Sequence, residues 1–182
     1  MTQLRDYAEA DEQSWLRCRV VGFLDTAYFD DVATSKPPRG LSLVATTGRE
    51  VIGLLDASLD GADATIETIV VHPDHRRHGI AKALLAEATS RLIARGAHQL
   101  DAWTRDDPGT LAWYAAHGFT EQMRYLHVYA STPDEAAACT PNAAHHLTPR
   151  AGFLHAWIEH EPALGKQFQR VHVCRQYIKQ LA

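Results

Sequence analysis

The feature that most constrains the fold is a strand, a turn and a helix that follow one another without a gap. The stretch "ATIETIVV" (64–71) is rich in β-branched residues, which favour strands, and Pro73 ends it. From Gly79 to Arg95 apolar residues recur at the helical spacing, and Gly96 is typical of the position just past a helix end. A second strand, "HQLDAWT", comes directly afterwards. This order predicts two parallel strands joined by a right-handed crossover.

The elements on either side predict a mixed α/β sheet. "QLRDY" is a short extended start, and Asp11 is a suitable N-cap for a helix from Glu12 to Gly22. "LSLVAT" and "VIGLLDASL" are strands joined by the hairpin turn "TGRE", and "LDTAYFDDV" is expected to be a second helix or a turn. "TLAWYAAH" predicts a short helix that Gly118 ends, and "FTEQMRYLHVYA" a long strand.

The pattern weakens beyond Ala130. "STPDEAAACTPNAAHHLTPRAG" is loop-like, "FLHAWIEH" favours a strand, "PALGKQFQ" a short helix and "RVHVCRQYIK" a closing strand. This tail either completes the sheet or covers the substrate. We expect a core of residues 1–130 and an extension of residues 131–182 within one domain.

Composition excludes several classes of protein. The formal net charge of -4 argues against general nucleic-acid binding, which needs a basic surface. The first residues are polar and acidic, unlike a secretory signal, and no apolar run approaches the ~20 residues that span a bilayer. The three cysteines are odd in number and far apart, which is typical of free thiols in a reducing compartment. We therefore expect a cytoplasmic protein that contacts neither nucleic acid nor membrane.

The turn before the long helix carries an unexpected charge. Arg76, Arg77 and His78 precede its first turn, although a helix N-terminus is electropositive and favours acidic residues. Gly79 lets the backbone approach a ligand, and successive N–H groups there could hold a phosphate, with the cations adding charge-assisted contacts. A solvated, charged turn is the alternative.

Two motifs in register resemble the GNAT superfamily of acyl-CoA-dependent N-acyltransferases. "IVVHPDHRRHGIAKALL" is similar to its acetyl-CoA-binding motif, V-x-P followed by Q/R-x-x-G-x-G/A at the start of a helix. The family's Y-x-x-x-G-F signature is present as Tyr114–Phe119, and the resemblance extends over residues 4 to 130 in element order. The positions that fill the first motif are Val71, Pro73, Arg76, Gly79 and Ala81.

The resemblance implies a GNAT-like mixed sheet, splayed between its two parallel strands, with helices on both faces and acetyl-CoA in the gap. The pyrophosphate would lie on backbone N–H groups of the turn, and the pantetheine arm would pair with the strand before it. Asp107 stands where the family often has an asparagine, and an ionised aspartate cannot donate a hydrogen bond. The residues implied to bind the coenzyme are Ile69, Val70, Val71, Arg76, Arg77, His78, Gly79, Ile80, Ala81, Lys82 and Asp107.

Acyl transfer to an amine needs a base, an oxyanion donor and an acid for the thiolate. Glu67 is the candidate base, and strand alternation predicts that it shares a face with Ile69 and Val71. Tyr114 is the candidate acid, and the N–H of Ile69 or a neighbour is the candidate oxyanion donor. A carboxylate in a polar network and a core aromatic are the respective alternatives.

Aromatic residues of the first helices are placed where the family has its acceptor wall. Phe23 and Tyr28 are the candidate substrate contacts, with ordinary core packing as the alternative. Nearby carboxylates could attract a cationic amine; they are Asp25, Asp30, Asp31 and Asp56. Four histidines form a loose cluster without metal-ligand spacing, so no metal is expected; they are His145, His146, His155 and His160.

The sequence therefore predicts an N-acetyltransferase that moves an acetyl group from acetyl-CoA to a primary amine in a ternary complex. Two alternatives remain open: a non-catalytic acyl-CoA-binding sensor or interaction module, and an acetyltransferase acting on protein N-termini or lysines. The acceptor is a small molecule or a peptide amine. Exposed strand edges leave a homodimer open.

Overall fold

The structure, a computed structural model, describes residues 2–139 and 147–181. The chain divides into two compact units, one of Met1–Trp103 with Ile178–Ala182 and the other of Thr104–Tyr177. Each unit has its own cluster of buried apolar side chains.

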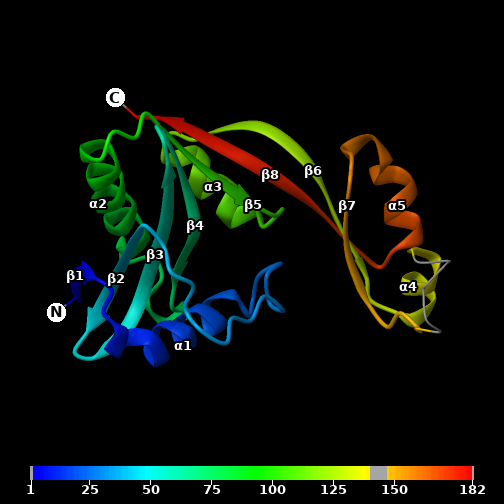
Figure 1. Ribbon diagram of the computed structural model, residues 1–182, viewed down its shortest axis with the longest axis horizontal. Coiled ribbons are helices and arrows are strands. Elements are labelled where there is room, and N and C mark those ends of the chain that lie inside the picture. Colours follow the sequence, from blue (N-terminus) through cyan, green and yellow to red (C-terminus); the bar gives the residue numbers. More distant parts are fainter. Residues whose placement is uncertain (1, 140–146, 182) are drawn as a thin grey trace. The chain divides into compact units, whose positions relative to one another are not determined.

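The first unit is built on five strands in the order β1-β2-β3-β4-β5 (Figure 1). Neighbours from β1 to β4 are antiparallel, whereas β4 and β5 are parallel, so the predicted mixed sheet is confirmed. The elements of this unit are β1 (Thr2–Asp6), α1 (Glu12–Phe23), β2 (Leu41–Thr47), β3 (Glu50–Asp60), β4 (Asp63–Val71), α2 (Ile80–Ala94) and β5 (Gln99–Thr104).

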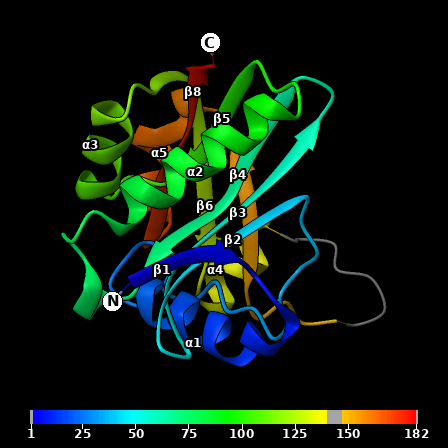
Figure 2. The same cartoon turned by 90° about the vertical axis from the view of Figure 1, so that its left-hand side faces the viewer.

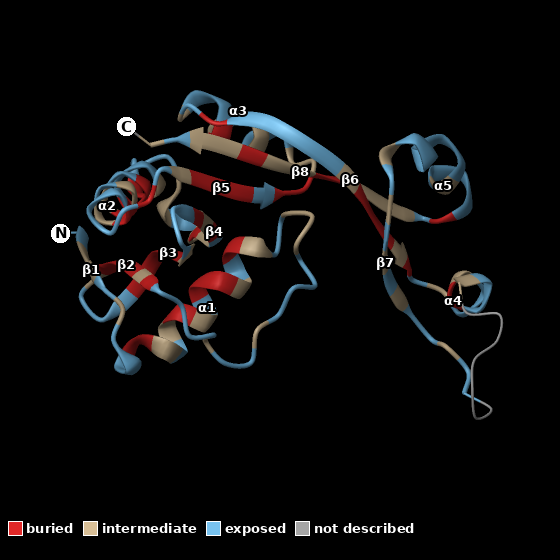
Figure 3. Ribbon diagram, turned by 45° about the horizontal axis from the view of Figure 1, so that its top comes forward, coloured by how far each residue is buried: buried red, intermediate tan, exposed pale blue. Residues whose placement is uncertain are grey.

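Helices α1 and α2 cover opposite faces of this sheet (Figures 2 and 3). Gly22 of α1 lies against Val70, whose Cγ1 would be 2.2 Å from a Cβ at that glycine. Gly53 of β3 lies against Ile80 of α2, with Cγ2 2.7 Å from an added Cβ. Val70 pairs with Leu54, the residue after Gly53, and successive residues of a strand face opposite sides. The predicted coverage of both faces is therefore confirmed for this unit.

The crossover helix forms as the sequence predicts. α2 begins after Gly79 and ends at Ala94, and Gly96 takes the left-handed conformation at φ 89° that closes many helices. Its sheet-facing side carries the helical repeat that the sequence shows, which comprises Ile80, Leu84, Leu85, Ala88 and Leu92, all buried.

Asp11 precedes α1 as predicted but does not cap it through its side chain. Its carboxylate accepts two hydrogen bonds from Arg5, at 2.6 and 2.8 Å, and a third from the N–H of Ala8 at 2.8 Å. Asp11 thus occupies the predicted N-cap position, but the prediction of a capping side chain was wrong, because the carboxylate binds the guanidinium of Arg5 and not the helix N–H groups. The Arg5 contact also lowers the pKa of Asp11.

The second unit contains strands in the order β8-β6-β7, with helices α4 and α5 packed on them (Figure 1). Its core contains Leu126, Val128, Phe168 and Val173. The elements are α3 (Pro108–Ala116), β6 (Thr120–Ala130), α4 (Pro133–Cys139), β7 (Gly152–Ala156), α5 (Glu161–Gln167) and β8 (Arg170–Gln180).

α4 lies in the segment that the sequence analysis described as loop-like, so that prediction was wrong there. Thr132 and Glu135 form the reciprocal contacts of a capping box: Glu135 N–H donates to Thr132 Oγ1 at 3.2 Å, and Thr132 N–H to Glu135 Oε2 at 3.0 Å. This T-x-x-E signal is readable in the sequence and was missed.

The tail supplies two strands. Within the second unit, β8 and β7 lie on either side of β6. In the first unit the N–H of Leu181, just after β8, donates to His98 O at 2.8 Å, beside β5. The tail thus contributes strands of its own, and its completion of one sheet with residues 1–130 stays a prediction.

The close approach of α1 to β4 predicts a clear effect of an added methyl group. Gly22→Ala should destabilise the protein by about 1–3 kcal/mol through overpacking against Val70. Gly165→Ala is the matched control, because that glycine is also helical and a Cβ there meets no atom within 4 Å. Thermal denaturation should show a lower Tm for Gly22→Ala and an unchanged or higher Tm for Gly165→Ala. Equal Tm values would contradict the packing described.

Candidate functional site

The two parallel strands part midway along β4. Their register runs from Asp63↔Gln99 to Ile66↔Ala102, while β4 continues to Val71. The N–H of His72 donates to Ile52 O on β3 at 2.9 Å, so by alternation the backbone groups of residues 69 and 71 point to the opposite edge. The predicted splay is confirmed, and it leaves an open strand edge that an extended ligand can join.

Ile69 and Val71 offer this edge, whereas Val70 does not. By the same alternation the backbone of Val70 faces β3, and its side chain, 5% exposed, belongs to the core with Trp15 and Cys18. Of the three strand residues predicted to bind the coenzyme, two therefore have backbone groups directed away from β3. Their binding role stays a prediction.

The turn after β4 directs unpaired backbone donors outward. A single 3-10 turn (Pro73–His75) leads to Arg77, whose φ of 65° is rare for a residue with a Cβ, and to Gly79 at φ 76°. The N–H of Ala83 donates to Gly79 O at 2.9 Å, so helix geometry leaves the four preceding N–H groups without an intrahelical acceptor. Donors at the positive end of a helix are suited to a phosphate.

Arg76 is already engaged inside the protein. Its guanidinium contacts both carboxylate oxygens of Asp25, at 2.6 and 2.8 Å, and donates to Gly22 O at 2.8 Å and Val71 O at 3.4 Å. The hydrogen bonds between them lower the pKa of Asp25 and raise that of Arg76. Coenzyme binding by Arg76 stays a prediction, but its charge has an internal partner and ties α1 to the end of β4.

The neighbouring cations of the turn are exposed. Arg77, His78 and Lys82 all have exposed side chains, and His78 contacts His75 O through Nδ1 at 3.3 Å. The charge available to an anionic ligand is therefore that of Arg77 and Lys82.

A β-bulge places Glu67 differently from the sequence-based expectation. β3 and β4 pair as Asp56↔Thr68 and then Ala57↔Ile66, so Glu67 is the extra residue of the bulge. The inserted residue shifts the alternation of side chains by one position, so the residues before and after the bulge do not follow one continuous alternating pattern. Glu67 therefore lies on the α1 face with Ser58, which pairs with Thr65 beyond the bulge.

Ile69 and Val71 lie on the α2 face, because Val71 pairs with Gly53, the residue that α2 contacts. The prediction that Glu67 shares their face was wrong. The alternation rule holds only while the register is unbroken, and one inserted residue at the parting of the strands changes it.

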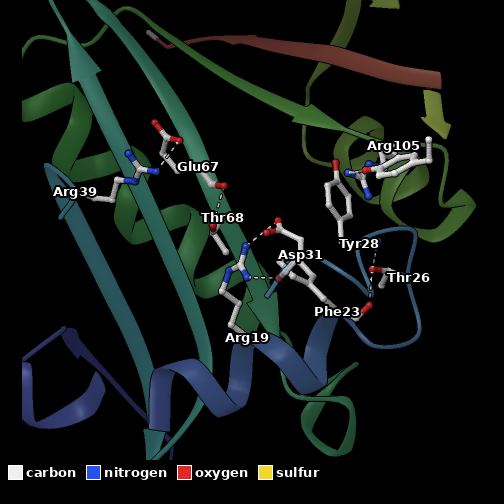
Figure 4. Close-up of polar contacts among 10 residues, drawn as sticks. Arg19, Phe23, Thr26, Tyr28, Asp31, Arg39, Glu67, Thr68 and Arg105 are labelled. Carbon is white, nitrogen blue, oxygen red and sulfur yellow. Dashed lines mark hydrogen bonds and ion pairs between the residues drawn. The ribbon is translucent and has the colours of Figure 1, made fainter. Parts of the chain in front are cut away.

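Glu67 is held from two directions, by Ser58 and by Arg39, and Figure 4 shows the contact with Arg39. Ser58 Oγ donates to its Oε1 at 2.7 Å, and Arg39 Nη2 lies 3.5 Å from its Oε2. The side chains of Glu67 and Arg39 are 28% and 35% exposed, so the ion pair is accessible to a substrate. Thr68 Oγ1 donates back to Glu67 O at 2.8 Å within the bulge.

Three of the four carboxylates expected near the acceptor wall, those of Asp25, Asp31 and Asp56, are paired with cations. The ion pairs on this face, beside that of Glu67, are Arg76–Asp25 at 2.6 Å, Arg19–Asp31 at 2.9 Å and Lys36–Asp56 at 3.1 Å. Lys36 and Asp56 are buried, with side chains 5% and 4% exposed. Their charges are therefore compensated in a low-dielectric environment, and neither is exposed to a ligand.

The two aromatic substrate candidates lie together beside α1 (Figure 4). The rings of Phe23 and Tyr28 are 5.4 Å apart and tilted by 31°, and the guanidinium of Arg19 lies 4.8 Å from the Phe23 ring. Trp15, another aromatic residue of α1, is 1% exposed and belongs to the core. Contact of Phe23 or Tyr28 with a substrate stays a prediction.

A pocket of ≈ 350 Å³ opens at the start of β2. Its size is within the range of small-molecule sites. Three cations and one carboxylate are among its lining residues, and Arg39 joins it to the ion pair at the bulge. The lining consists of Asp6, Tyr7, Lys36, Pro38, Arg39, Gly40, Leu41, Ser42 and Arg95.

Tyr114 and Asp107 belong to the second unit. Tyr114 is 4% exposed, stacks on Tyr177 at 5.5 Å and meets the edge of Phe119 at 5.1 Å. Asp107 occupies the N-cap position of α3, and its backbone oxygen accepts from the N–H of Thr110 at 3.0 Å. The roles of Tyr114 as acid and of Asp107 as coenzyme ligand stay predictions.

A buried histidine network in the second unit was not found from the sequence. Arg105 Nε donates to His127 Nδ1 at 3.2 Å, which leaves His127 Nε2 to donate to Tyr125 Oη at 2.9 Å. His155, one of the clustered histidines, stacks on His127 at 5.0 Å. Burial, and then the nearby Arg105 charge, lower the pKa of His127 to about 4. The pairing of β6 with β7 brings these rings together, and no local pattern carries that information.

Two of the predicted histidines, His145 and His146, lie outside the described residues. Within residues 2–139 and 147–181, no group of three or more His, Cys, Asp or Glu side chains is arranged to hold a metal ion. No helix in the same part of the chain is long and apolar enough to cross a bilayer.

Two of the three cysteine thiols, those of Cys18 and Cys174, are poor nucleophile candidates. Cys18 is 1% exposed, and burial raises its pKa to about 12. Burial also raises the pKa of Cys174, which is 2% exposed. A thiol acts as a nucleophile through its thiolate, and raised pKa values suppress that form.

Comparison with known proteins identifies one family. Residues 3–119 match the model described as Acetyltransferase (GNAT) family. An acetyltransferase of Pectobacterium atrosepticum is 30% identical over 121 residues, which are 66% of this chain and 82% of that relative.

Solved structures agree in fold. The crystal structure of the ribosomal-protein-S18-alanine N-acetyltransferase from Escherichia coli matches with a TM-score of 0.65 and 16% identity, over 100% of this chain and 95% of that one. A GNAT family acetyltransferase from Brucella melitensis in complex with acetyl-CoA gives 0.53 and 22%, over 66% and 83% of the two chains.

The environment of His127 predicts a ring that stays neutral at physiological pH. Because its pKa falls from the ordinary 6.5 to about 4, the unfolded chain takes up the proton first. The stability that depends on the neutral ring is complete above about pH 6.5 and is lost as the pH falls toward 4. Proton NMR should show no titration of the His127 ring between pH 8 and pH 5.5. Arg105→Gln should move its pKa upward, whereas a midpoint near 6.5 in the unaltered protein would contradict the burial described.

Proposed function

The chain belongs to the acetyltransferase (GNAT) family, and from that premise we propose that it transfers the acetyl group of acetyl-CoA to a primary amine in a ternary complex. The family is one of acetyl-CoA-dependent enzymes, and the chain has its mixed, splayed sheet. The observation that carries the proposal is the partly exposed carboxylate of Glu67, at the bulge where β4 parts from β5. A binding module without catalysis has no need of it.

The proposed coenzyme site uses backbone groups of the first unit. The pantetheine arm pairs with the free edge of Ile69 and Val71, and the pyrophosphate lies on the N–H groups of residues 77–82. The orphaned donors at the start of α2 and the positive φ of Arg77 and Gly79 support this fit. Once bound, acetyl-CoA supplies an activated carbonyl and a thiolate leaving group.

One side chain is proposed for each of the two proton transfers of the reaction. Glu67 takes the proton that the amine must lose as its nitrogen bonds to the acetyl carbon. Tyr114 gives a proton to the departing sulfur as the carbon–sulfur bond breaks, so that an amide and a free thiol result. The N–H of Ile69, on the open edge, is the proposed oxyanion donor.

Direct transfer is supported by the burial of two of the three thiols. An acyl-enzyme would need an activated nucleophile, and Cys18 and Cys174 are buried with raised pKa values. The proposal places the protein in the cytoplasm and retains residues 1–130 as core and 131–182 as extension. Phe23 and Tyr28 form part of the acceptor wall, and a homodimer stays open.

Replacing the proposed base should separate turnover from binding. Glu67→Gln keeps the size and the Ser58 contact but cannot accept the amine proton, so we expect kcat to fall on the order of 10²–10³-fold. The Kd for acetyl-CoA should not change. Glu50→Gln, an exposed carboxylate at the start of β3, is the matched control. Turnover is measured as coenzyme A release over a panel of amines, and unchanged kcat in Glu67→Gln would remove Glu67 from the mechanism.

Replacing the proposed acid tests the other end of the reaction. Tyr114→Phe preserves the ring stacked on Tyr177, so stability should change by less than about 1 kcal/mol while kcat falls roughly 10- to 100-fold. Tyr177→Phe is the control, because it removes a hydroxyl from the stacked partner. Equal kinetic effects in the two variants would assign Tyr114 to packing alone.

A further inference from the structure

The ion pair at the bulge differs from the other ion pairs on the α1 face. Arg39 and Glu67 are 3.5 Å apart with both side chains partly exposed, whereas Lys36 and Asp56 are 3.1 Å apart and buried. Exposed pairs of this length contribute little to stability, and breaking a buried pair is costly. Arg39 can therefore exchange its partner for a ligand at little cost, while Ser58 continues to hold Glu67.

The pairing on this face argues against a polycationic acceptor. Asp25, Asp31 and Asp56 each have a cationic partner, so these three carboxylates provide no surplus of negative charge for a chain of ammonium groups. The arrangement beside the reactive edge is instead one cation and one carboxylate, side by side. A molecule that carries its own amine and its own anionic group is complementary to both.

The pocket beside Arg39 is suited to the anionic end of such a molecule. Arg39 and Arg95 are the cations of its lining besides Lys36, whose charge is paired with Asp56, and Asp6 is the carboxylate in the lining. A guanidinium binds a carboxylate through two parallel hydrogen bonds, which gives geometric selectivity as well as charge complementarity.

Resting on the proposed function, we infer that Arg39 determines acceptor specificity by binding the acceptor's carboxylate, and that the acceptor is a free α-amino acid. Its amine and carboxylate are attached to one carbon, a short spacing that suits a guanidinium and a carboxylate 3.5 Å apart. The carboxylate of the acceptor replaces Glu67 on Arg39, and the amine lies at Glu67, which takes its proton.

The test uses acceptors matched in everything except the carboxylate. Glycine and the L-amino acids that have a primary α-amine are each compared with their own amide, and phenylalanine also with phenethylamine, by the kcat/KM of coenzyme A release with saturating acetyl-CoA. The amide loses its amine proton more readily than the amino acid, so intrinsic reactivity favours the amide. A preference for the amino acid must then come from the protein, and we expect at least about 10-fold for the best acceptor.

Variants of Arg39 show whether that preference originates at this residue. Arg39→Gln should lower kcat/KM for the amino acid about 10- to 100-fold, the cost of losing a charge-assisted contact, and leave the amide within about 3-fold. Arg39→Lys should restore part of the loss. Arg49→Gln, the same charge change in the exposed β2–β3 turn, should alter neither acceptor. Thermal melting and the Kd for acetyl-CoA confirm that each variant is folded.

The outcomes distinguish this inference from the proposed function. Amides, amines or peptides acetylated as well as the free amino acids would overturn the role of Arg39 and leave the acetyltransferase intact. An equal loss for both acceptors in Arg39→Gln would do the same. Release of no coenzyme A with any amine, from protein that binds acetyl-CoA, would overturn both.

Discussion

The parting of β4 from β5 after Ile66 is the constraint on which the rest of the site depends. Two parallel strands that stop pairing leave backbone N–H and C=O groups without their ladder partners, and such groups are costly unless they find others. The bulge at Glu67 coincides with this point. The open edge of β4 and the Glu67 carboxylate are therefore neighbours along the chain. The proposed coenzyme edge and the proposed base lie where both pairings of β4 become irregular.

Some charged residues that the sequence predicts to bind a ligand, among them Arg76 and Asp56, instead form ion pairs within the protein around this opening. Arg76 accounts for the oxygen of Val71 on the free edge and ties it to the C-terminal end of α1 through Gly22 O and Asp25. The buried ion pair of Lys36 and Asp56 ties the irregular segment between α1 and β2 to β3. Among the cations near the edge, Arg77 and Lys82 have exposed side chains that an anionic ligand can reach. The paired charges thus stabilise the segments around the edge, and the exposed charges of Arg77 and Lys82 are those proposed to attract the coenzyme.

Sequence reasoning succeeded where the signal is local. Short stretches of sequence predict the periodicity of α2, with Gly79 and Gly96 at the ends of that helix. A short stretch likewise predicts the hairpin of β2 and β3. It failed where the outcome depends on pairing between distant segments. The bulge is a property of the register of two strands, the Asp25 contact joins positions 51 residues apart, and the ring of His127 meets His155 only after β6 pairs with β7. The capping box of α4 is the exception, a local signal that was overlooked.

The most direct test of the account is to map coenzyme A onto the backbone amides by NMR, in the protein without an acceptor. The account predicts that the amides of Ile69 and Val71 and those of residues 77–82 shift most, because the free edge and the start of α2 hold the ligand. Amides of β1 and of α5 should stay in place. Perturbations centred away from β4 and the turn after it, or none at all at saturating coenzyme A, would contradict the account at its foundation.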